Sequence, residues 1–370
     1  AGGNEKGIHS QIDNLTVKLT GTNTVTAVYT PVLHTKPMTL TGGGTLNAES
    51  TKDCGIYVFK TSLTIDGCTV NAKGKWGIAG NDGSSETLTI RNATVTAEGT
   101  DGSICDFKEF TLYRCAITSP AGAVWNAEKK AVCDASGNII KSKVTIEPVT
   151  TYDLVIAGKR VNEVNCDDLS VIEGVSGTVN YDHSTKTLTL DNATINGGYR
   201  NGIESHIYNL TVKLIGTNAV MGTTFPAVVN YYNPMTITGN GTLNAESTNN
   251  CAILVYKTSL TIDGCTVNAK GKYGITGDSG SSESLALRNA TVTAEGTNGS
   301  IRYFNTLTLE GCKITSPAGA VWNAGKGAVC DASGNVITDK VTITRDTNGI
   351  ETVTADVPAG KRGVYNLQGV

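Results

Sequence analysis

The 370-residue sequence contains little proline, little histidine and little charge: 8 Pro, 4 His and 17% charged residues. The formal net charge is −3, and the basic residues are scattered, so the sequence has no basic patch of the kind that binds nucleic acid. No apolar run approaches the roughly 18 residues that a membrane-spanning helix needs. We therefore expect neither a nucleic-acid partner nor a membrane span.

Helical patterns and paired-cysteine motifs are also missing. No stretch shows the amphipathic period of a long helix, and the 10 cysteines include no CxxC pair, which disfavours structural zinc and thioredoxin-like redox chemistry. The histidines are isolated, and no calcium loop or phosphate-binding loop occurs. We expect no metal and no cofactor.

What the sequence does contain is a duplication. Residues 60–75, KTSLTIDGCTVNAKGK, recur unchanged at 257–272, and residues 117–127 recur at 314–324. The copies are 195 residues apart at Gly7 and Gly202 but 197 apart at Pro37 and Pro234. The second copy therefore gains two residues between these points, and the chain should form two similar domains.

A shorter period lies inside each copy. An apolar-Thr-apolar phrase, two turn residues and a second short strand recur at steps of 23, 25, 25 and 22 residues in the first copy. This predicts an all-β fold, a tandem right-handed parallel β-helix with about 22–25 residues per coil. The consensus of a leucine-rich repeat is missing from this sequence, and a β-propeller needs a longer period. The phrase begins at Leu15, Met38, Leu63, Leu88 and Phe110, and in the second copy at Leu188, Leu210, Met235, Leu260, Leu285 and Leu307.

Glycine or asparagine stands between the two short strands of the phrase. Both residues tolerate a left-handed backbone, so we expect a sharp bend in each coil there. The positions are Gly67, Asn92, Asn192, Gly264 and Asn289.

The cysteines follow the same repeat. Cys68 and Cys115 should lie in one column but two coils apart, roughly 10 Å by strand spacing, which is too far for a disulfide. We expect small buried thiols. The alternative is one or two disulfides per copy, involving Cys54 or Cys133.

The repeat divides the chain into residues 1–149 (first β-helix unit), 150–187 (a β-rich cap or linker), 188–345 (second unit) and 346–370 (a C-terminal tail). We expect a strand at residues 152–158 and a β-hairpin around Asp182-His183-Ser184. Such a cap would cover the open strand edges of the second unit. Ala1 aligns with Asn196, so the first copy holds no counterpart of this cap, and we expect further sequence upstream.

Two segments resemble known proteins. Residues 348–353 (NGIETV) and 363–369 (GVYNLQG) resemble the carboxyl-terminal tails of secreted Bacteroidetes proteins. Residues 152–195 look like segments that precede β-helical modules in such proteins, which are often adhesin-like or carbohydrate-binding. The resemblance implies an extracellular or outer-cell-surface location.

Two patterns suggest catalysis, and each also has an ordinary structural explanation. Asp66 and Asp263 could serve a β-helical polysaccharide lyase or glycoside hydrolase, but each is a single acid at a turn, where Asp is common. Ser279, in Gly-Asp-Ser-Gly, mimics a peptidase nucleophile, but the upstream triad partners are absent. We assign no catalytic residue.

Binding remains the favoured function. The copies differ most at 24–36 and 219–233, and segments that vary on a fixed scaffold are where recognition tends to occur. We expect a non-enzymatic, exported, adhesin-like surface protein whose partner is a polysaccharide or a host glycoprotein. The alternatives are a β-helical polysaccharide lyase or glycoside hydrolase, or the stalk of an immunoglobulin A protease-like protein. Aromatic rings could contact a sugar, or could simply cover the solenoid flank. The candidate ligand-binding residues are Tyr29, His34, Trp76, Tyr231, Tyr232 and Tyr273.

Overall fold

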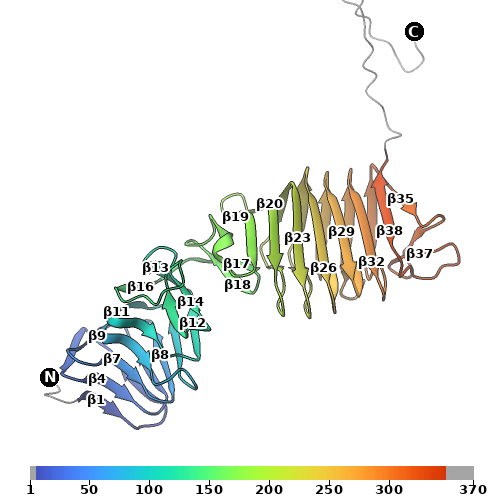
Figure 1. The fold of residues 1–370 in the computed structure, drawn as a ribbon. Coiled ribbons are helices and arrows are strands. Elements are labelled where there is room, and N and C mark those ends of the chain that lie inside the picture. Colours follow the sequence, from blue (N-terminus) through green and yellow to red (C-terminus); the bar gives the residue numbers. More distant parts are fainter. Residues whose placement is uncertain (1–5, 347–370) are drawn as a thin grey trace, which may run out of the picture. The chain divides into compact units, whose positions relative to one another are not determined.

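The computed structural model describes residues 6–346 (Figure 1). The predicted tail therefore lies outside the described residues, apart from Asp346. The described chain separates into two compact units, residues 6–152 with 161–167 and residues 153–160 with 168–346. Each unit is a stack of parallel coils, so the predicted β-solenoid is confirmed.

Each coil of the second unit contributes three short strands. Every strand pairs in parallel with its counterpart in the next coil, which produces three rows of strands along the unit. The first row is β22 (Leu210–Ile215), β25 (Met235–Gly239), β28 (Ser259–Asp263), β31 (Ser284–Arg288) and β34 (Thr306–Glu310); the second is β23 (Thr217–Gly222), β26 (Thr242–Ser247), β29 (Thr266–Gly271) and β32 (Thr291–Gly296); the third is β21 (Ile203–Ser205), β24 (Val228–Tyr231), β27 (Cys251–Tyr256), β30 (Tyr273–Gly277) and β33 (Ile301–Arg302).

The first unit has the same three rows. In its third and fourth coils the second and third strands merge into one long strand, β9 or β11. The first row is β2 (Leu15–Lys18), β5 (Met38–Thr41), β8 (Ser62–Asp66), β10 (Thr87–Arg91) and β12 (Glu109–Tyr113); the others are formed by β3 (Thr22–Ala27), β6 (Thr45–Ser50), β1 (Lys6–Ser10), β4 (Thr30–His34), β7 (Cys54–Val58), β9 (Thr69–Gly80) and β11 (Thr94–Cys105).

The strand register confirms the predicted columns. Leu88 pairs with Leu63 and Ile90 with Ile65, and these inward side chains are at most 1% exposed. The predicted bends are also confirmed, because all five Gly and Asn positions have positive φ, from 42° at Asn92 to 72° at Gly264. In the first two rows, alternation along each strand thus places Leu, Ile and Val inside and most Thr and charged residues outside. The strands of the third row are buried at nearly every position.

The predicted cap strand and hairpin form at the start of the second unit. Strand β17 (Thr151–Ile156) pairs antiparallel with β21, and β19 (Val175–Asp182) forms the hairpin with β20 (Thr187–Asn196). Strand β20 is long enough to pair with both β22 and β23. The segment also contains β18 (Lys159–Asn162) and one 3₁₀ turn, Leu169–Val171. No helix within residues 6–346 is long and apolar enough to cross a membrane.

The far end of each unit is closed by antiparallel strands with the same design. The closing strands are β13 (Cys115–Ser119), β14 (Val124–Asn126), β15 (Ala131–Cys133) and β16 (Val144–Pro148) in the first unit, and β35 (Cys312–Ser316), β36 (Val321–Asn323), β37 (Ala328–Cys330) and β38 (Val341–Arg345) in the second.

All ten cysteines are free thiols, so the disulfide alternative is wrong and the prediction of buried thiols is correct for nine of them. Burial raises the pKa of the Cys265 thiol to about 11 and that of Cys251 to about 12. Cys166 is the one cysteine that is not buried.

This arrangement predicts a graded reactivity toward a thiol reagent, because the thiolate is the reactive form and needs access. We expect Ellman's reagent to titrate one thiol rapidly in the native protein and the other nine only after unfolding. Cys166→Ser should abolish the rapid phase. Rapid labelling of two or more thiols in native Cys166→Ser would contradict the buried columns.

Candidate functional site

Aromatic rings gather at one corner of the second unit, where β21, β24 and β27 end. His206 directly follows β21, and Tyr231 pairs in register with Tyr256 of the next coil. The His206 and Tyr231 ring centroids are 4.8 Å apart, with an interplanar angle of 13°, and Tyr231 meets Tyr256 edge-on at 5.4 Å. One ring per coil therefore builds a short aromatic column.

Tyr232 adds a fourth ring beside this column. Its positive φ of 61° turns the chain sharply, and its N–H donates to the carbonyl oxygen of Tyr256. The ring lies 5.2 Å from that of Tyr256 and 6.1 Å from that of Tyr231. Its exposed fraction is 57%. We call His206, Tyr231, Tyr232 and Tyr256 the aromatic corner.

Charged and hydrogen-bonding groups surround the aromatic corner. The Glu204 carboxylate lies 3.4 Å from Nε2 of His206 and accepts a hydrogen bond from Asn201. The Lys257 ammonium lies 5.2 Å from the centroid of the Tyr256 ring. Burial, followed by the charge of Glu204, raises the pKa of Tyr231, so its hydroxyl is protonated at neutral pH and can both donate and accept.

The described residues of the first unit form no such corner, and two single-residue insertions separate the copies here. Val32 and Val228 are equivalent, since they pair with Ile56 and Ile253, and Val228 is 196 residues further along. One insertion therefore precedes this strand and the second follows it. The positions equivalent to His206, Tyr231 and Tyr256 are Gln11, Thr35 and Phe59.

The predicted ligand-binding role of His34 is wrong, because its side chain is buried. His34 is equivalent to Asn230, and its side chain is 0% exposed. Its Nδ1 bonds to the carbonyl of Lys36 at 2.9 Å, and burial lowers its pKa. A ring buried inside the solenoid cannot contact a surface ligand. Tyr29 is 50% exposed but is not part of an aromatic cluster among the described residues.

Trp76 and Tyr273, two further candidate ligand-binding residues, lie in strands. Trp76 is within β9, packs on the cluster that contains Cys54 and Cys105, and has the Lys75 ammonium 4.5 Å from its ring centroid. Tyr273 begins β30, 6.0 Å from the ring of Tyr303. Both side chains are half-buried and pack against neighbouring residues. A ligand-binding role for them stays a prediction.

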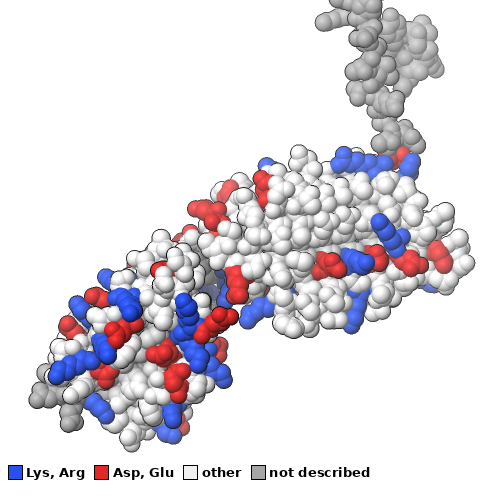
Figure 2. Space-filling view, viewed as in Figure 1, with Lys and Arg blue, Asp and Glu red and all other residues white. Residues whose placement is uncertain are grey.

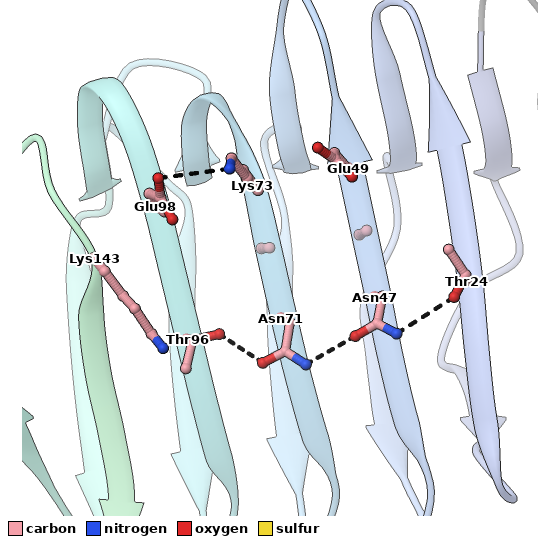
Figure 3. Close-up of a pocket in the computed structure, with 10 residues that line it drawn as sticks. Thr24, Asn47, Glu49, Asn71, Lys73, Thr96, Glu98 and Lys143 are labelled. Atoms are coloured by element: carbon pink, nitrogen blue, oxygen red, sulfur yellow. Dashed lines mark hydrogen bonds and ion pairs between the residues drawn. The ribbon is translucent and has the colours of Figure 1, made fainter.

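A second feature, the polar face, lies on the outward side of β3, β6, β9 and β11 in the first unit (Figure 3). Asn71 donates to Asn47 at 2.8 Å and accepts from Thr96 at 2.6 Å, and Asn47 donates to Thr24. A side-chain amide has two N–H groups and two lone pairs. The ladder therefore leaves part of each amide free for another partner.

Charged residues run beside this ladder. Glu49, Lys73 and Glu98 are in register on successive strands, and Lys73 forms an ion pair with Glu98 at 3.7 Å. They line a shallow groove of about 470 Å³ together with Lys143. Two carboxylates beside a lysine are residue types that a polysaccharide lyase or glycoside hydrolase could use. The Lys73–Glu98 ion pair, however, is half-exposed in an open groove.

The second unit repeats the polar face. Asn268 donates to Asn244 at 2.8 Å and accepts from Thr293 at 2.6 Å, and Lys270 pairs with Glu295 at 3.3 Å. In Figure 2 acidic and basic side chains form a line across the second unit, and much of the surrounding surface is uncharged. The polar face is thus common to both copies, whereas the aromatic corner belongs to one.

The catalytic candidates Asp66 and Asp263 have no second acid in register on the neighbouring strands. Asp66 is in register with Arg91, and Asp263 with Arg288. The hydroxyl of Ser279 is exposed and lies 2.7 Å from that of Ser281, and its described contacts include no histidine that could act as a base.

Two buried carboxylates went unrecognised in the sequence. Glu86 and Glu283 are both 0% exposed. Glu283 accepts from the backbone N–H groups of Lys257, Ser281 and Ser282 at 3.1–3.2 Å. Burial by itself would raise the pKa of Glu283, but these backbone hydrogen bonds outweigh it and the pKa is lowered. Both copies keep Ser-Ser-Glu at the end of a loop that otherwise varies, and that signal could have revealed them.

Within residues 6–346 no group of three His, Cys, Asp or Glu side chains is placed to hold a metal ion. Comparison with protein-family models, curated proteins and solved structures finds no match to this chain.

Proposed function

We propose that the chain is a glycan-binding solenoid of an exported surface protein and that the aromatic corner is its binding site. The observation that carries the proposal is the gathering of four rings at ring distances of 4.8–6.4 Å on one corner of a rigid scaffold. A duplicated scaffold that differs at this corner fits a recognition role. The export tail suggested by residues 348–369 supports a location at the cell surface.

The chemistry of the corner suits a sugar ring. A pyranose has an apolar C–H face that can pack on aromatic side chains, and hydroxyl groups around its edge. Tyrosine and histidine supply an apolar body with a polar tip. The Glu204 carboxylate and the Lys257 ammonium stand beside the rings and can form charge-assisted hydrogen bonds with hydroxyl groups.

Removing rings should weaken binding stepwise. We expect Tyr232→Ala to reduce affinity for a bound polysaccharide about 3- to 10-fold, because an aromatic contact is worth roughly 0.5–1.5 kcal/mol beyond its buried area. Tyr232→Ala with His206→Ala should reduce it further. A glycan array followed by titration calorimetry on the best ligand would measure this.

Tyr29→Ala in the first unit is the matched control, since it removes an exposed tyrosine that lies outside the corner. Equal losses in Tyr29→Ala and Tyr232→Ala would refute the site. Binding to no polysaccharide would contradict the proposed function and favour a rigid spacer. Release of reducing or unsaturated ends from a polysaccharide panel would establish the enzyme alternative instead.

A further inference from the structure

The first coil of the first unit is open on its outer side. Within residues 6–346, strands β1, β2 and β3 each pair on one side only, with β4, β5 and β6, and β1 lies at the outer end of its row in Figure 1. The equivalent strands of the second unit pair on both sides, because β17 and β20 cover them. An unpaired parallel edge presents N–H and C=O groups that a further strand can bind.

The first coils of the two units begin with nearly identical sequences. Residues 7–19 (GIHSQIDNLTVKL) and 202–214 (GIESHIYNLTVKL) differ at three positions. Under the cap, Leu210 and Val212 are at most 1% exposed, whereas Leu15 and Val17 are half-buried. The same apolar side chains are thus partly uncovered at the open edge.

The side chain of Asn23 marks a specific hydrogen-bonding position at this edge, as its equivalent Asn218 shows. Asn218 donates from its side chain to the carbonyls of Ile215 and Thr242, and its Oδ1 accepts the N–H of Ala193 in the cap at 2.8 Å. Asn23 makes the two equivalent donor bonds, to Thr20 and Thr45. No described residue donates to its Oδ1.

The backbone repeats this pattern. The Thr211 N–H donates to Lys186 of the cap at 3.0 Å, and the His206 N–H donates to Asp153 at 2.9 Å. The equivalent donors are the N–H groups of Thr16 and Gln11. The Gln11 N–H has no acceptor among the described residues. The Thr16 N–H points away from β5, the described partner of β2, because the neighbouring Leu15 N–H is the one bonded to Pro37.

We infer that this open edge is a docking site for a β-strand cap of the kind formed by residues 151–195. The partner's chemistry follows from the second unit: a strand whose inward residues match Leu188 and Leu190 over the leucine and valine column, followed by a backbone N–H placed for the Asn23 side chain. The inference is independent of glycan binding.

A fused chain tests this directly. Because Ala1 aligns with Asn196, joining a second copy of residues 151–195 in front of Ala1 of the full chain reproduces the native spacing. We expect amide hydrogen exchange at Gln11 and Thr16 to slow on the order of tenfold or more, with little change at Leu15. The matched control carries Leu188→Asp and Leu190→Asp in the fused copy only and should remain unprotected.

Equal exchange at Gln11 and Thr16 with and without the fused segment would overturn the inference. So would protection that is already present in the parent chain and rises with protein concentration, because a second copy of the chain would then be the occupant.

Discussion

Ile262→Ala should lower the free energy of unfolding of the second unit by about 2–5 kcal/mol, the usual cost of truncating a buried aliphatic side chain. Ile262 is 0% exposed and stacks between Ile237 and Leu287 of the adjoining coils. Neither neighbour can move into the cavity without breaking its own strand register. The lost contacts are therefore not recovered.

The measurement can isolate the second unit, because Trp322 is the one tryptophan within it and the other two, Trp76 and Trp125, lie in the first. In a Trp76→Phe, Trp125→Phe background, denaturant unfolding followed by fluorescence reports on this unit. The control is Thr261→Ala, whose side chain points outward on the same strand and should change stability by about 0.5 kcal/mol or less. Similar losses for both variants would count against the inward column.

Glu283→Leu should destabilise the second unit by roughly 3–5 kcal/mol, because it leaves buried backbone donors without an acceptor. The affected N–H groups are those of Lys257, Ser281 and Ser282. Glu283→Gln keeps one acceptor oxygen and the shape, so its loss should be smaller. Glu295→Gln, at an exposed ion pair, should cost at most about 1 kcal/mol.

The pH dependence of this loss has a defined sign. The pKa of Glu283 is lower in the folded protein than its ordinary value of 4.5, so the unfolded state binds the proton more readily. The stabilisation is full above that ordinary value and is lost as the pH falls through the folded pKa. The stability difference between the parent and Glu283→Gln should thus shrink from pH 7 toward pH 3. A difference that grows on acidification would show that burial dominates instead.

Part of the aromatic corner was predictable from the sequence, and more of it could have been. Tyr231 and Tyr232 stand out because the copies diverge there. His206 and Tyr256 were missed, although positions 206, 231 and 256 are 25 residues apart, which is the coil length. In a solenoid, residues one coil apart become neighbours, so applying the period to outward aromatic residues would have found the column.

The sequence by itself determined the architecture of this protein: the repeat length, the alternation of apolar and polar residues and the bend positions together require stacked coils. Which side chains of the third row face inward was decided by the tertiary structure: the strand that holds His34 is buried along its whole length, so alternation along the sequence does not predict the position of His34. The exposure of Leu15 and Leu210, identical in local sequence, was also decided there. Burial of a strand depends on which strand lies beside it, and a local sequence does not contain its neighbour.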